Sequence, residues 1–266
     1  MASAEKGVTS CPVYAFDGRA FSKADVDIIQ EMPLQIFLNG QHLVTIACTG
    51  LHVDELALGY LKSEGFIKDS SDIHDVRIDP DAGAVQLVTA AAMMPGPGPT
   101  DSPFRGSIAS SGARGTLREG HLSLPEPITR DAMQMSPEQV LQLMDRFIDL
   151  CRLHRITRGT HGAALTDGKE ILVVREDIGR HNALDMLAGH ALLNQWDCSD
   201  KAVLRTGRIS TEIVHKVWNL GTPVVVSLAV PTSRAIEMAI EAGITLIGAV
   251  RGKSMQVYTH ERRISL

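Results

Sequence analysis

The stretch V-V-R-E-D-I-G-R-H-N-A-L-D, residues 173–185, lies between a strand pattern and a helical pattern, and the fold prediction starts from it. Residues 171–174 are apolar and predict a buried strand, whereas a helical pattern begins after the charged turn. Charged groups crowded into one short turn are costly to desolvate unless they pair or meet a ligand. Because open α/β sheets bind ligands at the carboxyl ends of their strands, this turn is a candidate ligand site. A solvated connection with an Arg–Glu pair is the alternative.

Downstream of this stretch, apolar strands alternate with helices, which predicts a largely parallel sheet with helices on both faces. The expected helices span residues 182–194, 211–220 and 234–242, and the expected strands span residues 202–205, 224–229, 244–250 and 256–259. Upstream, Ser136 and Pro137 predict the start of a helix that runs to about residue 154, because a hydroxyl N-cap and a first-turn proline favour helix initiation. A hairpin over residues 163–174 then leads into the charged turn.

The N-terminal half has a different pattern and predicts a smaller α+β domain. Apolar alternation around Asn39-Gly40 predicts a hairpin over residues 34–47, because both turn positions need a positive φ. A helix over residues 53–64 and a second hairpin over residues 76–88 follow. Residues 1–32 show no sustained period, and residues 1–10 are expected to be a mobile tail. Residues 93–103 are expected to be a linker, and residues 107–115 form a glycine-rich loop.

The predicted organisation is therefore an N-terminal extension (residues 1–33), a smaller α+β domain (34–130) and an α/β domain (131–266).

Composition excludes several classes of protein. The net charge is 26 − 31 = −5, which does not favour general nucleic-acid binding. The chain has neither an apolar run long enough to span a membrane nor the apolar core of a signal peptide, so a cytoplasmic protein is expected. The four cysteines are far apart and give neither C-x-x-C metal spacing nor a disulfide framework. Histidines fall on different predicted elements, so no metal site is expected, and no nucleophile elbow of a hydrolase is present.

The turns that follow the strands predict an anion site. Several helix N-termini are expected at one edge of the sheet, and helix N-termini favour negatively charged ligands. The basic residues near these turns are Arg180, Arg208, Arg234, Arg251 and Lys253. His161 and His181 are candidate proton carriers or hydrogen-bonding groups, and a purely structural role is the alternative for each. Residues 248–254 contain G-K-S, but the spacing is one residue short of a phosphate loop.

Several long motifs resemble the FdhD family of formate dehydrogenase accessory sulfurtransferases. They are E-D-I-G-R-H-N-A-L-D (176–185), D-E-L-A-L-G-Y-L-K-S-E-G-F-I (54–67), T-H-G-A-A (160–164), G-R-I-S-T-E-I-V-H-K (207–216) and T-L-I-G-A-V-R-G-K-S-M-Q-V-Y-T-H (245–260). The resemblance covers the chain from about residue 34 to the C-terminus.

The resemblance implies a cytoplasmic homodimer whose C-terminal three-layer α/β/α domain is similar to the cytidine deaminase fold. It implies transfer of persulfide sulfur from a cysteine desulfurase to the molybdenum bis(molybdopterin guanine dinucleotide) cofactor, which then enters formate dehydrogenase. The family's cofactor-binding segment maps onto Ala249, Val250, Arg251, Gly252, Lys253 and Ser254. Gly179, Arg180, His181 and Arg208 are expected to complete the cofactor site.

One departure from the family changes the expected chemistry. The family's C-G-x-C-G loop reads S-G-A-R-G here, so Ser111 and Arg114 occupy the positions of the two thiols. Neither side chain can hold a persulfide, since sulfur transfer needs a thiolate. Three hypotheses follow: a cofactor-binding accessory protein that carries no sulfur, a sulfurtransferase that uses Cys48, Cys151 or Cys198, and a binding or regulatory module that has lost the maturation role.

Overall fold

The computed structural model describes residues 5–89 and 125–265. Its strands are β1 (Val8–Phe16), β2 (Phe21–Ile29), β3 (Met32–Leu38), β4 (Gln41–Cys48), β5 (Ile73–Asp79), β6 (Ala84–Thr89), β7 (His161–Thr166), β8 (Ile171–Asp177), β9 (Ala202–Arg205), β10 (Val224–Ser227), β11 (Thr245–Arg251) and β12 (Ser254–Thr259). Its α-helices are α1 (Val53–Ser63), α2 (Pro137–Leu150), α3 (Arg152–Thr157), α4 (Arg180–Leu193), α5 (Thr211–Leu220) and α6 (Ser233–Ala242). Two short 3-10 helices span Ser70–Asp72 and Glu261–Arg263.

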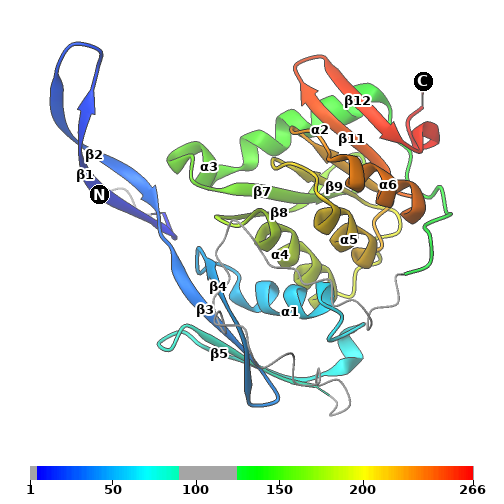
Figure 1. Cartoon of the computed structure of the whole chain (residues 1–266), viewed down its shortest axis with the longest axis horizontal. Helices are drawn as coiled ribbons and strands as arrows, with labels where there is room; N and C mark the ends of the chain where they lie inside the picture. The colour runs from blue at the N-terminus through cyan, green and yellow to red at the C-terminus, as the bar shows by residue number, and fades with distance from the viewer. Residues whose placement is uncertain (1–4, 90–124, 266) are drawn as a thin grey trace.

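A six-stranded sheet in the order β12-β11-β10-β9-β7-β8 forms the centre of the C-terminal part (Figure 1). Helices α4, α5 and α6 pack on one face, against a core that includes Leu165, Val203, Val225 and Leu246. Helix α2 packs on the other face, against Ala164, Leu204, Val226 and Ile247. Alternate residues of each strand therefore face different helices, as a pleated sheet requires. The C-terminal part is a three-layer α/β/α structure, as the sequence predicts; its closer likeness to cytidine deaminases stays a prediction.

The expectation of a largely parallel sheet is wrong. Strands β9, β10 and β11 run parallel, but β7 is antiparallel to both β8 and β9, and β12 is antiparallel to β11. The hairpins over β7–β8 and β11–β12 add antiparallel strands at both sides of the parallel centre. The strand predicted at residues 171–174 is present as the first part of β8, but it is only partly buried. Strand β8 lies at the edge of the sheet, with Val173 buried and Leu172 exposed.

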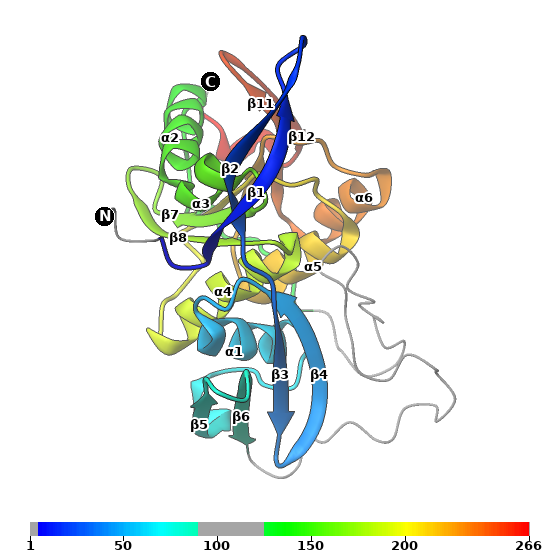
Figure 2. The same ribbon diagram turned by 90° about the vertical axis from the view of Figure 1, so that its left-hand side faces the viewer.

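The smaller sheet, in the order β4-β3-β6-β5, lies beneath helix α1, which separates it from α4 (Figures 1 and 2). Helices α1 and α4 cross at two glycines. A Cβ atom at Gly59 would lie 1.7 Å from the carbonyl oxygen of Asp185, and one at Gly189 would lie 1.9 Å from that of Glu55. No larger residue fits at either position, and this contact fixes the smaller sheet to the α/β/α part.

Both predicted hairpins of this part are present. At the first turn Asn39 has φ 50° and Gly40 has φ 78°, as the Asn-Gly pair predicts.

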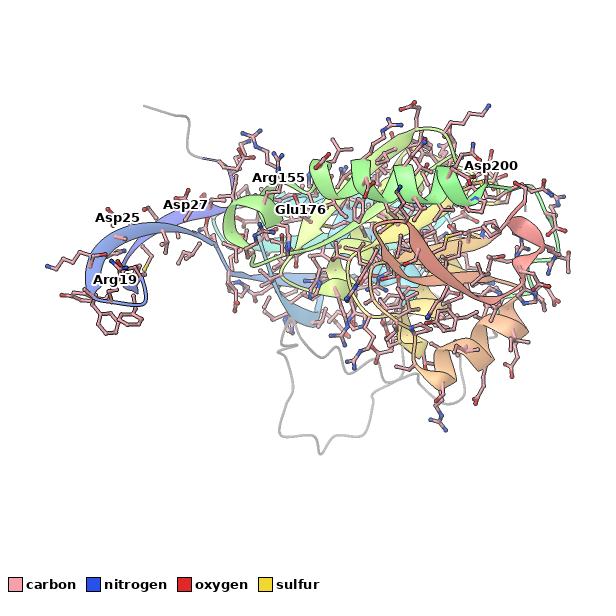
Figure 3. The ribbon with its side chains drawn as sticks, turned by 90° about the horizontal axis from the view of Figure 1, so that it is seen from above. Arg19, Asp25, Asp27, Arg155, Glu176 and Asp200 are labelled. Carbon is pink, nitrogen blue, oxygen red and sulfur yellow. The ribbon has the colours of Figure 1, made fainter. Side chains whose placement is uncertain are left out.

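Strands β1 and β2 form a ribbon that projects away from the rest of the molecule (Figures 1 and 3). The expectation of a mobile tail is therefore wrong for residues 8–10, which pair with residues 27–29. The pattern was missed because the ribbon is exposed on both faces, with Tyr14, Phe16 and Phe21 among its most exposed side chains. A strand that packs against no core has no reason to alternate between apolar and polar residues.

The helix predicted to run from Ser136 to about residue 154 is broken in two. Ser136 caps α2, and its hydroxyl accepts a hydrogen bond from the backbone N–H of Gln139. Helix α2 ends at Leu150, and α3 starts at Arg152 after a non-helical residue, Cys151. The linker over residues 93–103 and the loop over residues 107–115 lie outside the described residues, as do Ser111 and Arg114. Within the described ranges, no helix is both long and apolar enough to cross a membrane.

Candidate functional site

The carboxyl ends of β8, β9, β10 and β11 lie together at one end of the large sheet, which we call its carboxyl edge. The registers place His161 opposite Asp177, Ala163 opposite Arg205, and Ser227 beside Arg205. Helices α4, α5 and α6 each begin after a strand that ends at this edge. The N-termini of these helices therefore lie on the side that the sequence predicts for an anion.

Arg175, Glu176 and Asp177 of the stretch 173–185 form ion pairs or hydrogen bonds with other parts of the fold. Arg175 pairs with Glu55 of α1, and its Nη2 also lies 3.1 Å from Nδ1 of His190. Glu176 accepts hydrogen bonds from the backbone N–H groups of Leu153 and His154 at 2.9 and 2.7 Å, and so caps the start of α3.

Asp177 is fully buried and accepts hydrogen bonds from Gly179, Asn182 and both the backbone and the hydroxyl of Thr49. Burial raises the pKa of Asp177, although these four donors oppose the shift. Asp177 ties the end of β4 to the turn before α4. Arg175, Glu176 and Asp177 thus lie in β8 and hold neighbouring elements in place. They form neither the expected charged turn nor the solvated connection that was its alternative, although Arg175 does form an ion pair with a glutamate, Glu55.

Arg180 and His181, the first two residues of α4, belong to a group that we call the cationic cluster: His161, Arg180, His181, Arg205 and Ser210. Pleating puts His161 and Arg205 on the α4 face of the sheet, since Ala163 and Val203 face the helices there. A Cβ atom built at Gly207 would lie 3.2 Å from Nη2 of Arg205, 3.4 Å from Nδ1 of His161 and 3.5 Å from Cβ of Arg180. Gly207 thus leaves a small space that these three side chains surround.

Polar atoms of the cationic cluster lack partners. In the described part of the chain, eight buried side-chain nitrogen or oxygen atoms have no hydrogen-bond partner, and six of them belong to Arg180, His181, Arg205 and Ser210. His181 Nε2 lies 2.9 Å from a carboxylate oxygen of Glu212, but the approach lacks the direction of a hydrogen bond. Buried polar groups are almost always paired, so this concentration of unpartnered atoms makes the cluster a candidate ligand site.

The electrostatics of the cluster favour a negatively charged group. Burial, together with Arg180, lowers the pKa of Arg205 to about 9. Burial, followed by Lys216, Arg180 and Arg205, lowers the pKa of His181 to about 3. The pKa of His161 is lowered by burial and then by Arg205 and Arg180. An anion would reverse each of these shifts, because it favours the protonated forms.

Two helix N-termini at the cluster are open. Gly179 occupies the N-cap of α4 and has no side chain, and Ser210 occupies the N-cap of α5 without making a capping hydrogen bond. By contrast, Thr232 caps α6, as Ser136 caps α2. The Gly179 N–H donates to Asp177, and neither N-cap residue supplies a side chain to the first-turn N–H groups, which favour an anion.

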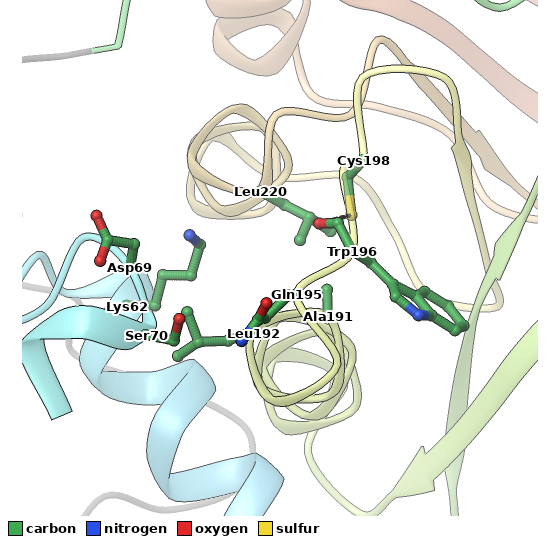
Figure 4. Close-up of a pocket in the computed structure, with 9 residues that line it drawn as sticks. All are labelled: Lys62, Asp69, Ser70, Ala191, Leu192, Gln195, Trp196, Cys198 and Leu220. Carbon is green, nitrogen blue, oxygen red and sulfur yellow. Dashed lines mark hydrogen bonds between the residues drawn. The ribbon is translucent and has the colours of Figure 1, made fainter. Parts of the chain in front are cut away.

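A pocket of about 520 Å³ adjoins the cluster, and its lining includes Cys151, His154, Thr160, His161 and Thr206. A second pocket, of about 310 Å³, lies at the other end of α4, where Lys62, Trp196 and Cys198 line it (Figure 4). The first pocket shares His161 with the cationic cluster, whereas the second is separated from the cluster by the length of α4.

The buried thiols are poorly suited to sulfur transfer. Burial raises the pKa of Cys48 and of Cys151 to about 12 and that of Cys198 to about 11. Thiols with such pKa values carry almost no thiolate near pH 7. Among the described residues, no group of three His, Cys, Asp or Glu side chains is placed to hold a metal ion.

The FdhD/NarQ family model matches residues 29–265. A sulfur carrier protein FdhD from Bacillus subtilis is 36% identical over 252 residues, which cover 95% of each chain. The chain belongs to the FdhD/NarQ family. A second relative of the same name, from Geobacillus kaustophilus, is 35% identical over 253 residues with the same coverage.

The fold of this FdhD/NarQ protein is also found in a crystal structure from Desulfotalea psychrophila, of a protein provisionally described as a formate dehydrogenase accessory protein. The TM-score is 0.78 with 21% identity, over 97% of this chain and 99% of that chain.

The predicted cofactor residues of this FdhD/NarQ protein fall into two sets. Gly179, Arg180 and His181 lie at the start of α4, in or beside the cationic cluster. Arg251, Gly252, Lys253 and Ser254 lie at the exposed tip of the β11–β12 hairpin, and Ala249 and Val250 precede them in β11. Four strand spacings separate β8 from β11, or roughly 19 Å at the usual spacing, so only an extended ligand reaches both sets.

Arg208 is exposed on the turn between β9 and α5, and Arg234 is exposed on the first turn of α6. Sequence analysis missed Arg205 and Ser210. Arg205 ends an apolar run, A-V-L-R, and nothing in that pattern distinguishes a buried arginine from one at the solvent boundary.

Proposed function

We propose that this FdhD/NarQ protein binds the molybdenum bis(molybdopterin guanine dinucleotide) cofactor at the carboxyl edge of its large sheet and passes it to formate dehydrogenase. The observation that carries the proposal is the concentration of unpartnered buried polar atoms at that edge. A dinucleotide cofactor brings phosphate groups, which suit arginine side chains and open helix N-termini. It is also extended enough to reach from the start of α4 towards the β11–β12 hairpin.

The buried and the exposed residues of the site would contact different parts of the cofactor. Arg180, Arg205 and Ser210 would hold phosphate oxygens inside the edge. Exposed Arg208, Arg251 and Lys253 would attract the anionic cofactor and contact its outer end. Before an anion binds, the lowered pKa values of His161 and His181 keep both rings neutral near pH 7, and a bound phosphate would favour their protonated forms. The molybdenum arrives with the cofactor as cargo.

Calorimetric titration with GDP, a stand-in for the guanine end of the cofactor, tests the proposal. Binding in the micromolar range is expected. The double substitution Arg251→Ala, Lys253→Ala should weaken binding, whereas exchange of exposed Arg77 for Ala on β5 should leave it unchanged. No binding up to millimolar GDP would remove the cofactor role and favour a regulatory module.

We also propose that the protein carries no sulfur on the family's loop, since Ser111 and Arg114 replace the two thiols. The second candidate function is sulfur transfer through another cysteine, and Cys151 is its strongest candidate because it lines the pocket beside His161. Its raised pKa weighs against this role. Incubation with a cysteine desulfurase and cysteine, followed by mass spectrometry, is expected to find no persulfide. A persulfide on Cys151 would establish the second function.

The proposal includes a homodimer. One face of the β1–β2 ribbon is free of charge and carries Thr9, Cys11, Val13, Ala15, Ser22, Ala24, Val26 and Ile28. A two-stranded ribbon is marginally stable by itself, so such a face favours association with a second copy. Sedimentation velocity is expected to give a dimer for the natural protein and a monomer after Val13→Glu and Val26→Glu together. A dimer that survives both changes would move the interface elsewhere.

A further inference from the structure

We propose that Arg205, Arg180 and Ser210 form an inner subsite for a phosphoryl group, set behind His161 and Gly207 at the sheet edge. This inference rests on the proposed function and deepens it. The expected ligand is a tetrahedral oxyanion, either free phosphate or pyrophosphate or the phosphoryl groups of a guanine nucleotide.

Arg205 is the centre of the subsite. Its side chain is 2% exposed. In the described part of the chain it makes neither a hydrogen bond nor an ion pair, and Nε and Nη1 are both buried orphans. An unpaired buried guanidinium is expensive, because burial removes its hydration and nothing replaces it. A bound oxyanion would accept two parallel hydrogen bonds from this planar group, the geometry that arginine offers to phosphate.

Among the described residues, the surroundings of Arg205 add hydrogen-bond donors and no carboxylate that pairs with it. Arg180 contributes a second guanidinium whose Nε is also unpartnered, and the Ser210 hydroxyl is a third orphan. The carboxylate of Glu212 lies 2.9 Å from Nε2 of His181, and its side chain is one-third exposed. Asp177, although adjacent in the sheet, is fully engaged by Thr49, Gly179 and Asn182. The positive charge of the two arginines is therefore uncancelled.

Helix geometry supports the same ligand. The N-termini of α4, with 14 residues, and of α5, with 10 residues, have no side-chain caps. Ser210 is among the residue types that cap a helix most readily, yet its hydroxyl makes no hydrogen bond to the first turn of α5. Two open N-termini beside two unpaired arginines make a site for a dianion.

Gly207 controls access to the subsite. Its φ lies outside the left-handed region, so alanine meets no backbone strain there, yet the added Cβ would stand 3.2 Å from Nη2 of Arg205. Gly207→Ala therefore narrows the subsite without removing any charge. It complements Arg205→Met, which removes the charge and keeps an unbranched apolar stem.

The experiment is a calorimetric titration of the full chain with phosphate, pyrophosphate, GDP and guanosine. The natural protein is expected to bind pyrophosphate and GDP more tightly than guanosine. Arg205→Met should lower the affinity for pyrophosphate and GDP at least about tenfold, and Gly207→Ala should also lower both, while the weak binding of guanosine stays the same. Arg77→Met removes one exposed positive charge on β5 and is the matched control, expected to bind all four ligands as the natural protein does.

The outcomes separate the two proposals. Unchanged GDP affinity in both Arg205→Met and Gly207→Ala overturns the subsite and leaves the cofactor proposal standing. Arg205-dependent binding of pyrophosphate without binding of GDP supports the subsite as a site for a free oxyanion and overturns the cofactor proposal. Binding of neither pyrophosphate nor GDP to the natural protein overturns both. Circular dichroism and thermal melting of each variant confirm that it is folded before titration.

Discussion

Lys216 and Arg205 are two buried cations in the same half of the molecule, and they have opposite surroundings. Lys216 of α5 is 7% exposed, and its amino group lies 2.7 and 3.0 Å from the two carboxylate oxygens of Asp185. Burial alone would lower the pKa of Lys216, but Asp185 and Glu64 raise it overall. Arg205 is 2% exposed, has no carboxylate partner among the described residues, and has a pKa lowered to about 9.

The difference shows what each charge is for. The carboxylate of Asp185 also accepts a hydrogen bond from Ser63 of α1, at 2.7 Å, so Lys216 completes a closed network that joins α1, α4 and α5. A closed network holds helices together and has no capacity for a ligand. Arg205 belongs to an open network, which by our proposal an anion completes. Burial and charge alone do not separate the two cases; the partners do.

The same substitution at both positions tests this comparison most strongly. Lys216→Met leaves Asp185 buried without its cation, and we expect the free energy of unfolding to fall by about 3–5 kcal/mol. Urea denaturation measures this change. A loss smaller than about 1 kcal/mol would mean that the Lys216 network contributes little to stability and would contradict its structural role.

The neutral state of His181 predicts a pH dependence of the free energy of unfolding, with a smaller effect than that of Lys216→Met. The unfolded ring protonates below its ordinary pKa of 6.5, whereas the folded ring stays neutral down to a pKa of about 3. Stability from the neutral ring is therefore fully present above pH 6.5 and is lost as the pH falls toward 3.

We expect His181→Gln to flatten the decline in free energy of unfolding between pH 6.5 and 4.5, by up to about 1.4 kcal/mol per pH unit. The groups that act on this ring are Lys216, Arg180, Arg205, His161 and Glu212. Urea denaturation at several pH values measures the slope. Exposed His74→Gln is the control and should leave it unchanged. Equal slopes in all three proteins would show that His181 is not held neutral.

Much of the fold follows from patterns that depend on a core. The predicted boundaries of β9 and α5 agree with the structure, because apolar strands and amphipathic helices there pack on both sides. The strand directions were harder to predict. The alternation of strands and helices over residues 202–250 gives the parallel centre, but the β7–β8 and β11–β12 hairpins make the sheet mixed. The β1–β2 ribbon left no signal, since its side chains pack on no core.

The candidate site was predictable only in part. Gly179, Arg180 and His181 stand out because charge interrupts an apolar pattern there. Arg205 does not, because its role depends on what surrounds it in space: Arg180 from α4, Gly207 from the next turn, and the lack of a carboxylate in the described structure. Conversely, Glu176 and Asp177 looked like ligand-binding groups, yet they hold α3 and Thr49 in place.

The stability of Arg205→Met without ligand is the counterpart of the Lys216→Met test, because it measures the effect of removing the unpaired cation. Since it removes an unpaired buried charge and leaves no carboxylate stranded, we expect the free energy of unfolding to stay the same or to rise by about 1 kcal/mol. Urea denaturation in phosphate-free buffer measures it. A loss comparable to that of Lys216→Met would show that Arg205 is a structural cation whose partner lies outside the described residues.

The exposed charges of the β11–β12 hairpin define the smallest expected effect. Arg251 and Lys253 lie in solvent, where single charges contribute little to stability. We therefore expect Arg251→Ala, Lys253→Ala to change the free energy of unfolding by less than about 0.5 kcal/mol. If the same variant loses affinity for GDP, the hairpin contributes to binding alone, and the site extends from the start of α4 to the far side of the sheet. If the variant is destabilised as much as Lys216→Met, these side chains hold the hairpin in place, and any loss of binding reports that displacement rather than a lost contact.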